Sequence, residues 1–312
     1  MVRQLESEDR VVRKQAIGII IFLSAFLAGY FLVPNTVVIE TRKIDALKID
    51  SVELDALSGD VSLETIEDVI DDSSDIDSSG IRLLEVGKGF HGEEVDAKNG
   101  ETWLGLFAYG KGAEVRSTTI RVNRVHDPIV DGNSTDRTGK DVSISSSLNP
   151  IFLIKNAKAV RQGSVETIFR GITLDEAIES ELDLSLDEKL TRLDKNFLQT
   201  YNIDGRQYVL RVIKAKNSKG ENLLTLALEF QGTRQILHTM QTSYEGELGI
   251  KEWLGNVGTL YWVGDLDGDR KPDFYIDLFW HDNISDRVLF LSSEAKKGQL
   301  VRKAARFTTS GC

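Results

Sequence analysis

Four aspartates fall within nine residues near the C-terminal end of the chain, in the stretch "DLDGDRKPD". Numbered from the first aspartate, carboxylates stand at positions 1, 3, 5 and 9, which are Asp265, Asp267, Asp269 and Asp273, while position 7 is Lys271, whose carbonyl offers a further oxygen. Calcium takes about six to eight oxygen ligands at about 2.3–2.6 Å, and a tightly coiled loop turns alternate side chains toward one centre. The spacing therefore predicts a Ca²⁺ site with these residues as its ligands.

The residues around the aspartates favour a strand-loop-strand arrangement. Gly268 allows a sharp turn, and Pro272 fixes the exit into a strand expected over Phe274–Trp280. Because the carboxylates repel one another unless a cation lies among them, a bound ion would chiefly stabilise the fold. A solvated acidic hairpin that holds no ion is the alternative.

This stretch resembles the calcium loops of FG-GAP and VCBS-type repeats, whose motif D-x-D-G-D-G-x-x-D lies between two strands. The resemblance covers Val263–Leu278, and it matches the motif at each acidic position. Arg270 replaces the second glycine of the motif, at a cost of about 1 kcal/mol if its backbone is left-handed. The motif occurs once, which departs from a repeat propeller, and Ile276 stands where an EF-hand has its glutamate. The resemblance implies a single calcium loop, and the end of the chain is similar to those of bacterial exported proteins.

An uncharged apolar stretch near the N-terminus predicts a membrane anchor. Residues 16–33, "AIGIIIFLSAFLAGYFLV", carry no charge. At about 1.5 Å per residue in a helix they extend roughly 27 Å, close to the thickness of a bilayer core. We therefore assign residues 15–33 to a transmembrane helix. A cleaved signal peptide is the alternative, but its apolar region is usually about 7–15 residues and ends in small residues spaced A-x-A, whereas Phe26 stands two positions before the candidate Ala28.

The charges that flank this stretch predict the topology. Arg13 and Lys14 adjoin it on the N-terminal side, and basic residues favour the cytoplasmic face. We expect a single-pass protein of the inner (cell) membrane with residues 1–14 in the cytoplasm and the bulk of the chain in the periplasm. Extracytoplasmic calcium modules bind at about 10⁻⁴–10⁻³ M, which suits that compartment.

The net charge of −11 is concentrated in one segment. Asp45 to Gly80 holds twelve acidic residues and one basic residue, so we interpret residues 34–80 as an acidic linker. The remainder is nearly neutral and shows no basic groove, which argues against nucleic acid as a partner. The single cysteine, Cys312, excludes an intrachain disulfide.

Beyond residue 80, short apolar runs alternate with turn signals. Asn99-Gly100, Asp204-Gly205 and Gln231-Gly232 separate runs rich in β-branched and aromatic residues, a pattern typical of antiparallel hairpins. We predict a mainly β extracytoplasmic region, sandwich-like or barrel-like, in two parts: residues 81–170, and residues 171–312 with the calcium-type turn.

Two further features belong to this organisation. Two capping-box patterns favour one or two short helices between Leu174 and Leu193, and the polar stretch Asp131–Ser147 reads as a long loop.

The remaining candidates for chemistry are weaker. Gly87-x-Gly89-x-x-Gly92 spells a dinucleotide fingerprint but lacks the helix that must follow it. His126-Asp127 and His281-Asp282 resemble halves of a base and its orienting acid, without a recognisable nucleophile.

Three tryptophans, Trp253, Trp262 and Trp280, flank the acidic turn and fit either sugar stacking or, better, core packing. We expect a calcium-stabilised, membrane-anchored module that binds a protein or glycan, or is structural, without catalysis. The alternative is an envelope hydrolase with an unrecognised or metal-assisted site, for which Asp277, His281 and Asp282 would have to converge.

Overall fold

The computed structural model describes residues 80–109, 112–171, 190–241, 255–278 and 283–311. All of them lie in the compact unit Asp60–Cys312. The predicted anchor and linker, and the predicted helices as far as residue 189, lie outside the described residues. Within the described part of the chain, no helix combines the length and apolarity needed to cross a bilayer.

All regular secondary structure in the described ranges is β-strand, which confirms the prediction of a mainly β fold. The strands are β1 (Arg82–Leu84), β2 (Gly87–Phe90), β3 (Thr102–Tyr109), β4 (Gly112–Val125), β5 (Gly139–Ile144), β6 (Phe152–Lys155), β7 (Gly163–Arg170), β8 (Arg192–Asp194), β9 (Leu198–Ile203), β10 (Arg206–Lys216), β11 (Asn222–Phe230), β12 (Thr233–Gln241), β13 (Asn256–Asp265), β14 (Asp273–Asp277), β15 (Ile284–Leu291) and β16 (Arg302–Ser310).

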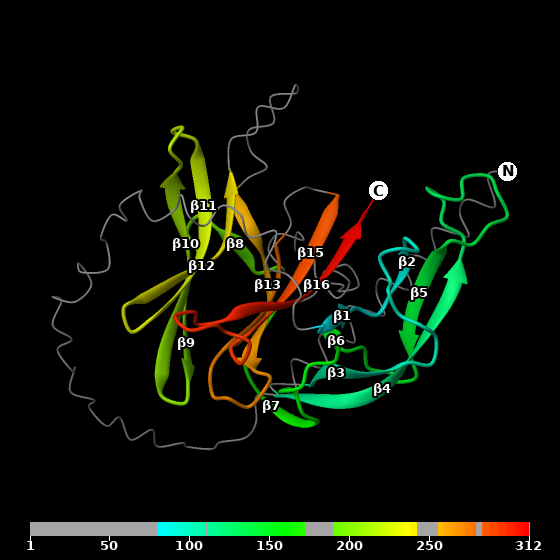
Figure 1. The fold of residues 1–312 in the computed structure, drawn as a ribbon, viewed down its shortest axis with the longest axis horizontal. Helices are drawn as coiled ribbons and strands as arrows, with labels where there is room; N and C mark the ends of the chain where they lie inside the picture. Colours follow the sequence, from blue (N-terminus) through cyan, green and yellow to red (C-terminus); the bar gives the residue numbers. More distant parts are fainter. Residues whose placement is uncertain (1–79, 110–111, 172–189, 242–254, 279–282, 312) are drawn as a thin grey trace, which may run out of the picture. The chain divides into compact units, whose positions relative to one another are not determined.

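The larger sheet is antiparallel and nearly closed. Its strand order is β1-β6-β3-β4-β7-β13-β14-β15-β16, with β5 added to β4, β2 to β5 and β8 to β13. β1 and β16, the two ends of this order, come together (Figure 1) and line a common cleft. We call this meeting line the seam. The sheet combines strands from both sides of residue 170, because β7 pairs with β13.

The strands of the calcium-type hairpin are buried on both faces. In β14, Tyr275 packs in a core that includes Trp262 and Phe152, inside the nearly closed sheet. Its neighbours Phe274 and Ile276 pack in a second core. Successive side chains of a strand point to opposite faces, so a strand covered on both faces reads as the continuous run of apolar residues seen here.

The second core joins the larger sheet to a four-stranded antiparallel sheet of order β12-β11-β10-β9. Leu210 and Leu226 from the smaller sheet share this core with Phe274. Both predicted turns of the smaller sheet are present, and each has positive φ at its two central residues: 48° and 72° at Asp204 and Gly205, and 47° and 82° at Gln231 and Gly232. This is the type I′ pattern that suits two-residue hairpins.

Part of the larger sheet extends away from the barrel-like order. The first half of β4, Gly112–Thr119, pairs with β3, whereas Ile120–Val125 pairs with β5 alone. We call the second half of β4, together with β5 and β2, the arm (Figure 1). The prediction of a loop over Asp131–Ser147 is wrong for β5. Only Gly139 and Val142 of that strand are buried, so its sequence lacks the alternation that marks a half-buried strand.

Candidate metal centre

The aspartate-rich loop connects two paired strands. β13 ends at Asp265 and β14 begins at Asp273, and Gly264 is the register partner of Asp273. β14 ends at Asp277, before the described residue Leu278, and the last two residues of the expected strand, Phe279 and Trp280, lie outside the described residues. Two buried strands therefore hold both ends of the loop.

Three of the predicted ligands converge. Asp265, Asp267 and Asp269 each place one carboxylate oxygen within 4.8 Å of the corresponding oxygens of the other two. All three side chains are partly buried. Among the described residues, no other group of three or more histidines, cysteines and acids comes this close. We call these three residues the carboxylate triad.

The loop backbone fixes the triad in place. Asp265 accepts hydrogen bonds from the amides of Gly268 and Arg270, at 2.8 and 3.0 Å, and Asp269 accepts one from the amide of Lys271 at 2.9 Å. Gly268 and Arg270 both adopt left-handed conformations, with φ of 79° and 63°. Arg270, which stands where the motif has glycine, therefore has the left-handed backbone whose cost the sequence analysis predicted.

The other two predicted ligands have additional contacts. The Nζ of Lys271 lies 3.1 Å from Asp269, so its side chain is a counter-ion to the triad. Asp273 is fully buried and accepts hydrogen bonds from the Leu266 amide at 2.7 Å, the Ser292 amide at 2.7 Å and the Ser292 hydroxyl at 3.1 Å. Asp273 thus ties the base of the loop to the end of β15.

Burial makes the negative charge of this loop unfavourable. It raises the pKa of Asp265 and of Asp267, and the neighbouring Asp269 adds to both shifts. Burial also raises the pKa of Asp273 well above its usual range, with a further contribution from Asp267. A divalent cation among these oxygens would offset the cost of burying their charges and the smaller repulsion between them.

Two serines that the sequence did not point to complete the surroundings of the triad. The Ser292 hydroxyl shares its one proton between Asp269, at 2.9 Å, and Asp273, and the Ser293 amide lies 3.4 Å from Asp267. They follow β15, whose Phe290 is the register partner of Phe274. No sequence motif marks these serines. They lie beside the triad because β15 pairs with β14.

The histidine pairs suggested by the sequence are arranged differently. Asp127 pairs with His91, at 2.6 Å, and not with its sequence neighbour His126. His126 lies 3.7 Å from Asp131. Of the second pair, His281 and Asp282 lie outside the described residues.

Asp277, the third member of the proposed hydrolase group, is held by other partners. It accepts hydrogen bonds from the Ser285 hydroxyl and the Asp286 amide, both at 2.7 Å. Trp262 is fully buried and donates to Thr167 at 3.2 Å, in agreement with core packing. Trp253 and Trp280 lie outside the described residues.

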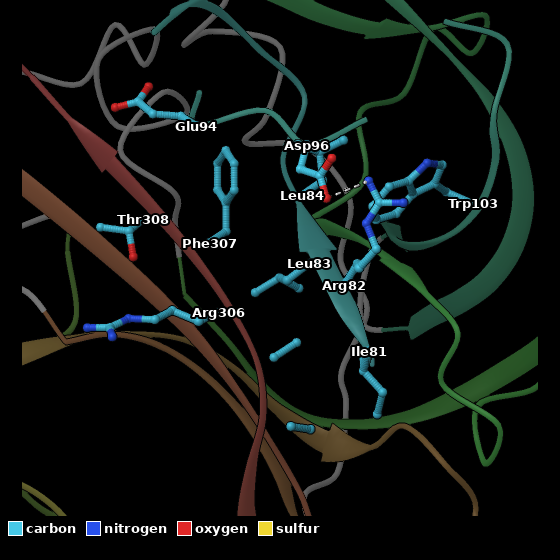
Figure 2. A pocket seen from close by; sticks show the side chains of 12 residues that line it. Ile81, Arg82, Leu83, Leu84, Glu94, Asp96, Trp103, Arg306, Phe307 and Thr308 are labelled. Atoms are coloured by element: carbon cyan, nitrogen blue, oxygen red, sulfur yellow. Dashed lines mark ion pairs between the residues drawn. The ribbon is translucent and has the colours of Figure 1, made fainter. Parts of the chain in front are cut away.

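The seam contains a cleft of about 200 Å³. Figure 2 shows Leu83 and Phe307 between β1 and β16, and Arg82 reaching toward Asp96 at 3.6 Å. Arg82 also lies over the ring of Trp103. The lining residues are Ile81, Arg82, Leu83, Leu84, Glu94, Asp96, Trp103, Ala304, Ala305, Arg306, Phe307 and Thr308.

Side chains hold the two sides of the seam together. Glu94 accepts hydrogen bonds from the Ser310 amide at 2.6 Å and from its hydroxyl at 2.9 Å. Glu85, which follows β1, accepts a hydrogen bond from Tyr275 at 2.5 Å and forms an ion pair with Arg287. These contacts join the first described strands to the last three.

Comparisons with known proteins add no relative to this description. No family model matches the chain, and no curated protein and no solved structure matches it significantly.

Proposed function

We propose that this protein is a calcium-stabilised binding or structural module, anchored to the membrane through residues 16–33 and working outside the cytoplasm on a protein or glycan partner, without catalysis. The convergence of Asp265, Asp267 and Asp269 is the observation that carries the calcium part of this proposal. The anchor rests on the uncharged N-terminal stretch.

Three properties of the triad support calcium. Its ligand atoms are carboxylate oxygens, which hard cations prefer. The strands at both ends of the loop are buried, so rigid elements hold both ends of the loop that carries the ligands. The raised pKa values of Asp265 and Asp267 show that the folded chain holds their charges at a cost, and a cation that binds only the folded state stabilises it.

Thermal unfolding of the full chain in detergent, with millimolar calcium or with chelator, tests the calcium part. At calcium about tenfold above the dissociation constant, the fold should gain about 1.4 kcal/mol, seen as a higher midpoint. Identical midpoints in the two conditions would contradict the proposal.

Neutralising the triad should separate the charge effect from the ion effect. Asp267→Asn removes a charge that the fold carries at a cost, so we expect a higher midpoint in chelator and a smaller gain on adding calcium. Asp96→Asn is the matched control, because the Asp96 side chain is 99% exposed and lies outside the loop. It should leave the calcium response unchanged.

A further inference from the structure

The end of the arm carries a second surface, unrelated to the calcium-type loop. Residues 126–138 connect β4 to β5, and Ile129 and Val130 lie within this connection, 61% and 59% exposed. Five large hydrophobic side chains are exposed in the described ranges, and these two are the adjacent pair among them. Adjacent exposed aliphatic side chains cost solubility unless they contact something.

Two buried aspartates hold this apolar pair outward. One Asp127 oxygen accepts hydrogen bonds from the amides of Ile129 and Val130, at 3.0 and 3.1 Å. Asp131 accepts hydrogen bonds from the Asp127 amide at 2.8 Å and from the Thr138 hydroxyl at 2.7 Å. The backbone under the pair is thereby fixed in advance, which reduces the entropy lost on binding.

The same arrangement leaves two exposed arginines against one exposed acid at the connection. Asp127 is buried against His91 and Asp131 is buried against Thr138, so neither acid faces outward. Arg124 lies just before the connection and Arg137 lies near its end. Both are exposed, and neither forms an ion pair within the described ranges. Asp136 is the exposed acid of the connection, and it accepts a hydrogen bond from Ser134.

We propose that the end of the arm docks on an anionic lipid surface, with Ile129 and Val130 entering the interface and Arg124 and Arg137 meeting the headgroups. Charge complementarity selects this partner: a cationic rim is attracted to acidic headgroups at about 1 kcal/mol per basic residue, while the apolar apex gains by leaving water. The proposal depends on neither the calcium site nor the N-terminal anchor.

The test places an environment-sensitive fluorophore on single cysteines of the full chain. Cys312→Ser removes the native cysteine, and Val130→Cys carries the probe at the apex. Leu198→Cys is the matched control, because Leu198 is 60% exposed on β9 of the smaller sheet. Both proteins are incubated with nanodiscs of phosphatidylcholine with or without phosphatidylglycerol and with spin-labelled acyl chains as quenchers.

With phosphatidylglycerol, the probe at residue 130 should shift to the blue and lose intensity to the quencher, while the probe at residue 198 stays unchanged. Arg124→Glu with Arg137→Glu should abolish the shift. The matched pair Lys216→Glu with Lys219→Glu, both exposed on the smaller sheet, should keep it.

Three outcomes would overturn the proposal. The probe at residue 130 could show no shift with phosphatidylglycerol. Quenching could be equal at residues 130 and 198, which would reflect proximity from anchoring alone. The same blue shift could be present without lipid, which would show that something other than a lipid surface covers the apex.

Discussion

At the scale of single residues, the candidate metal centre divides by burial into two sets. The triad is partly exposed and gathers three carboxylates around one point, whereas Asp273 is fully buried and already satisfied by three donors. Spacing predicted the loop and the convergence of alternate side chains. Spacing did not distinguish Asp273 from the triad. Asp273 ties the loop to β15 through Ser292, which is distant in the sequence and adjacent in the fold.

Asp273→Asn tests this division. The amide nitrogen of asparagine would face a backbone amide where the carboxylate now accepts a hydrogen bond, and an unsatisfied buried group costs about 1–3 kcal/mol. We expect that loss of unfolding free energy in calcium and in chelator alike. A loss confined to calcium solutions would instead place Asp273 among the ligands. Chemical denaturation in both conditions measures the difference.

Arg270 provides the second prediction at this scale. Its φ of 63° costs about 1–2 kcal/mol in a residue with a Cβ. Glycine avoids this cost, but its greater conformational entropy stabilises the unfolded chain and offsets part of the gain. Arg270→Gly should therefore raise the free energy of unfolding by up to about 1 kcal/mol, measured by denaturant titration. Arg161→Gly is the control, because Arg161 is exposed and has no positive φ. It should give no gain, and a loss at Arg270 would mean that its side chain contributes more than its backbone costs.

At the scale of strands, turn signals predicted the hairpins of the smaller sheet, and the apolar run after Pro272 predicted β14, whereas β5 and β16 carry no such signal. Tyr208, Leu210 and Val212 of β10 alternate with more exposed residues, as a strand with one buried face after the predicted Asp204-Gly205 turn should. In β16, Ala304 and Ala305 are both buried because the pairing with β15 shifts register between Leu289 and Phe290, and such a bulge removes the period of two. No local sequence pattern predicted that β1 and β16 would meet at the seam.

The seam gives the prediction at this scale. Glu85 is the partner of both Tyr275 and Arg287, and the Arg287 side chain is 12% exposed. Removing one partner of a buried ion pair costs about 3–5 kcal/mol when the other is left uncompensated, and Asp277, 3.5 Å from Arg287, offsets part of this cost. Glu85→Gln should lower the free energy of unfolding by about 2–4 kcal/mol, measured by denaturant titration. The control Glu114→Gln breaks an exposed pair with Arg116 and should cost less than about 1 kcal/mol. Equal losses would show that Glu85 contributes no more than a surface contact.

At the scale of the whole described unit, the second core joins the two sheets. Leu210 and Leu226 of the smaller sheet pack with Phe274, Ile276 and Val288 of the larger one. Composition and turn spacing predicted two β parts along the chain, but they carried no information about strand order. The pairing of β7 with β13 depends on contacts between residues about a hundred positions apart, which local patterns do not encode.

We therefore expect the two sheets to unfold together. Leu226→Ala, at a fully buried position of the smaller sheet, should lower the free energy of unfolding by about 2–5 kcal/mol and move a single calorimetric transition. Leu198→Ala, at an exposed position of the same sheet, should change it by less than about 0.5 kcal/mol. A second transition appearing in Leu226→Ala would mean that the smaller sheet unfolds on its own.

The seam also sets how this fold would respond to mechanical load. The described chain begins at Gly80, directly before β1, which has only three residues and is paired with β6. Tension applied through the N-terminal segment reaches this short strand first and then the Glu85 ion pair behind it. Traction from that end would load the pairing of β1 with β6 and the contacts across the seam before it loads the hairpins, so the direction of pulling decides which bonds bear the force.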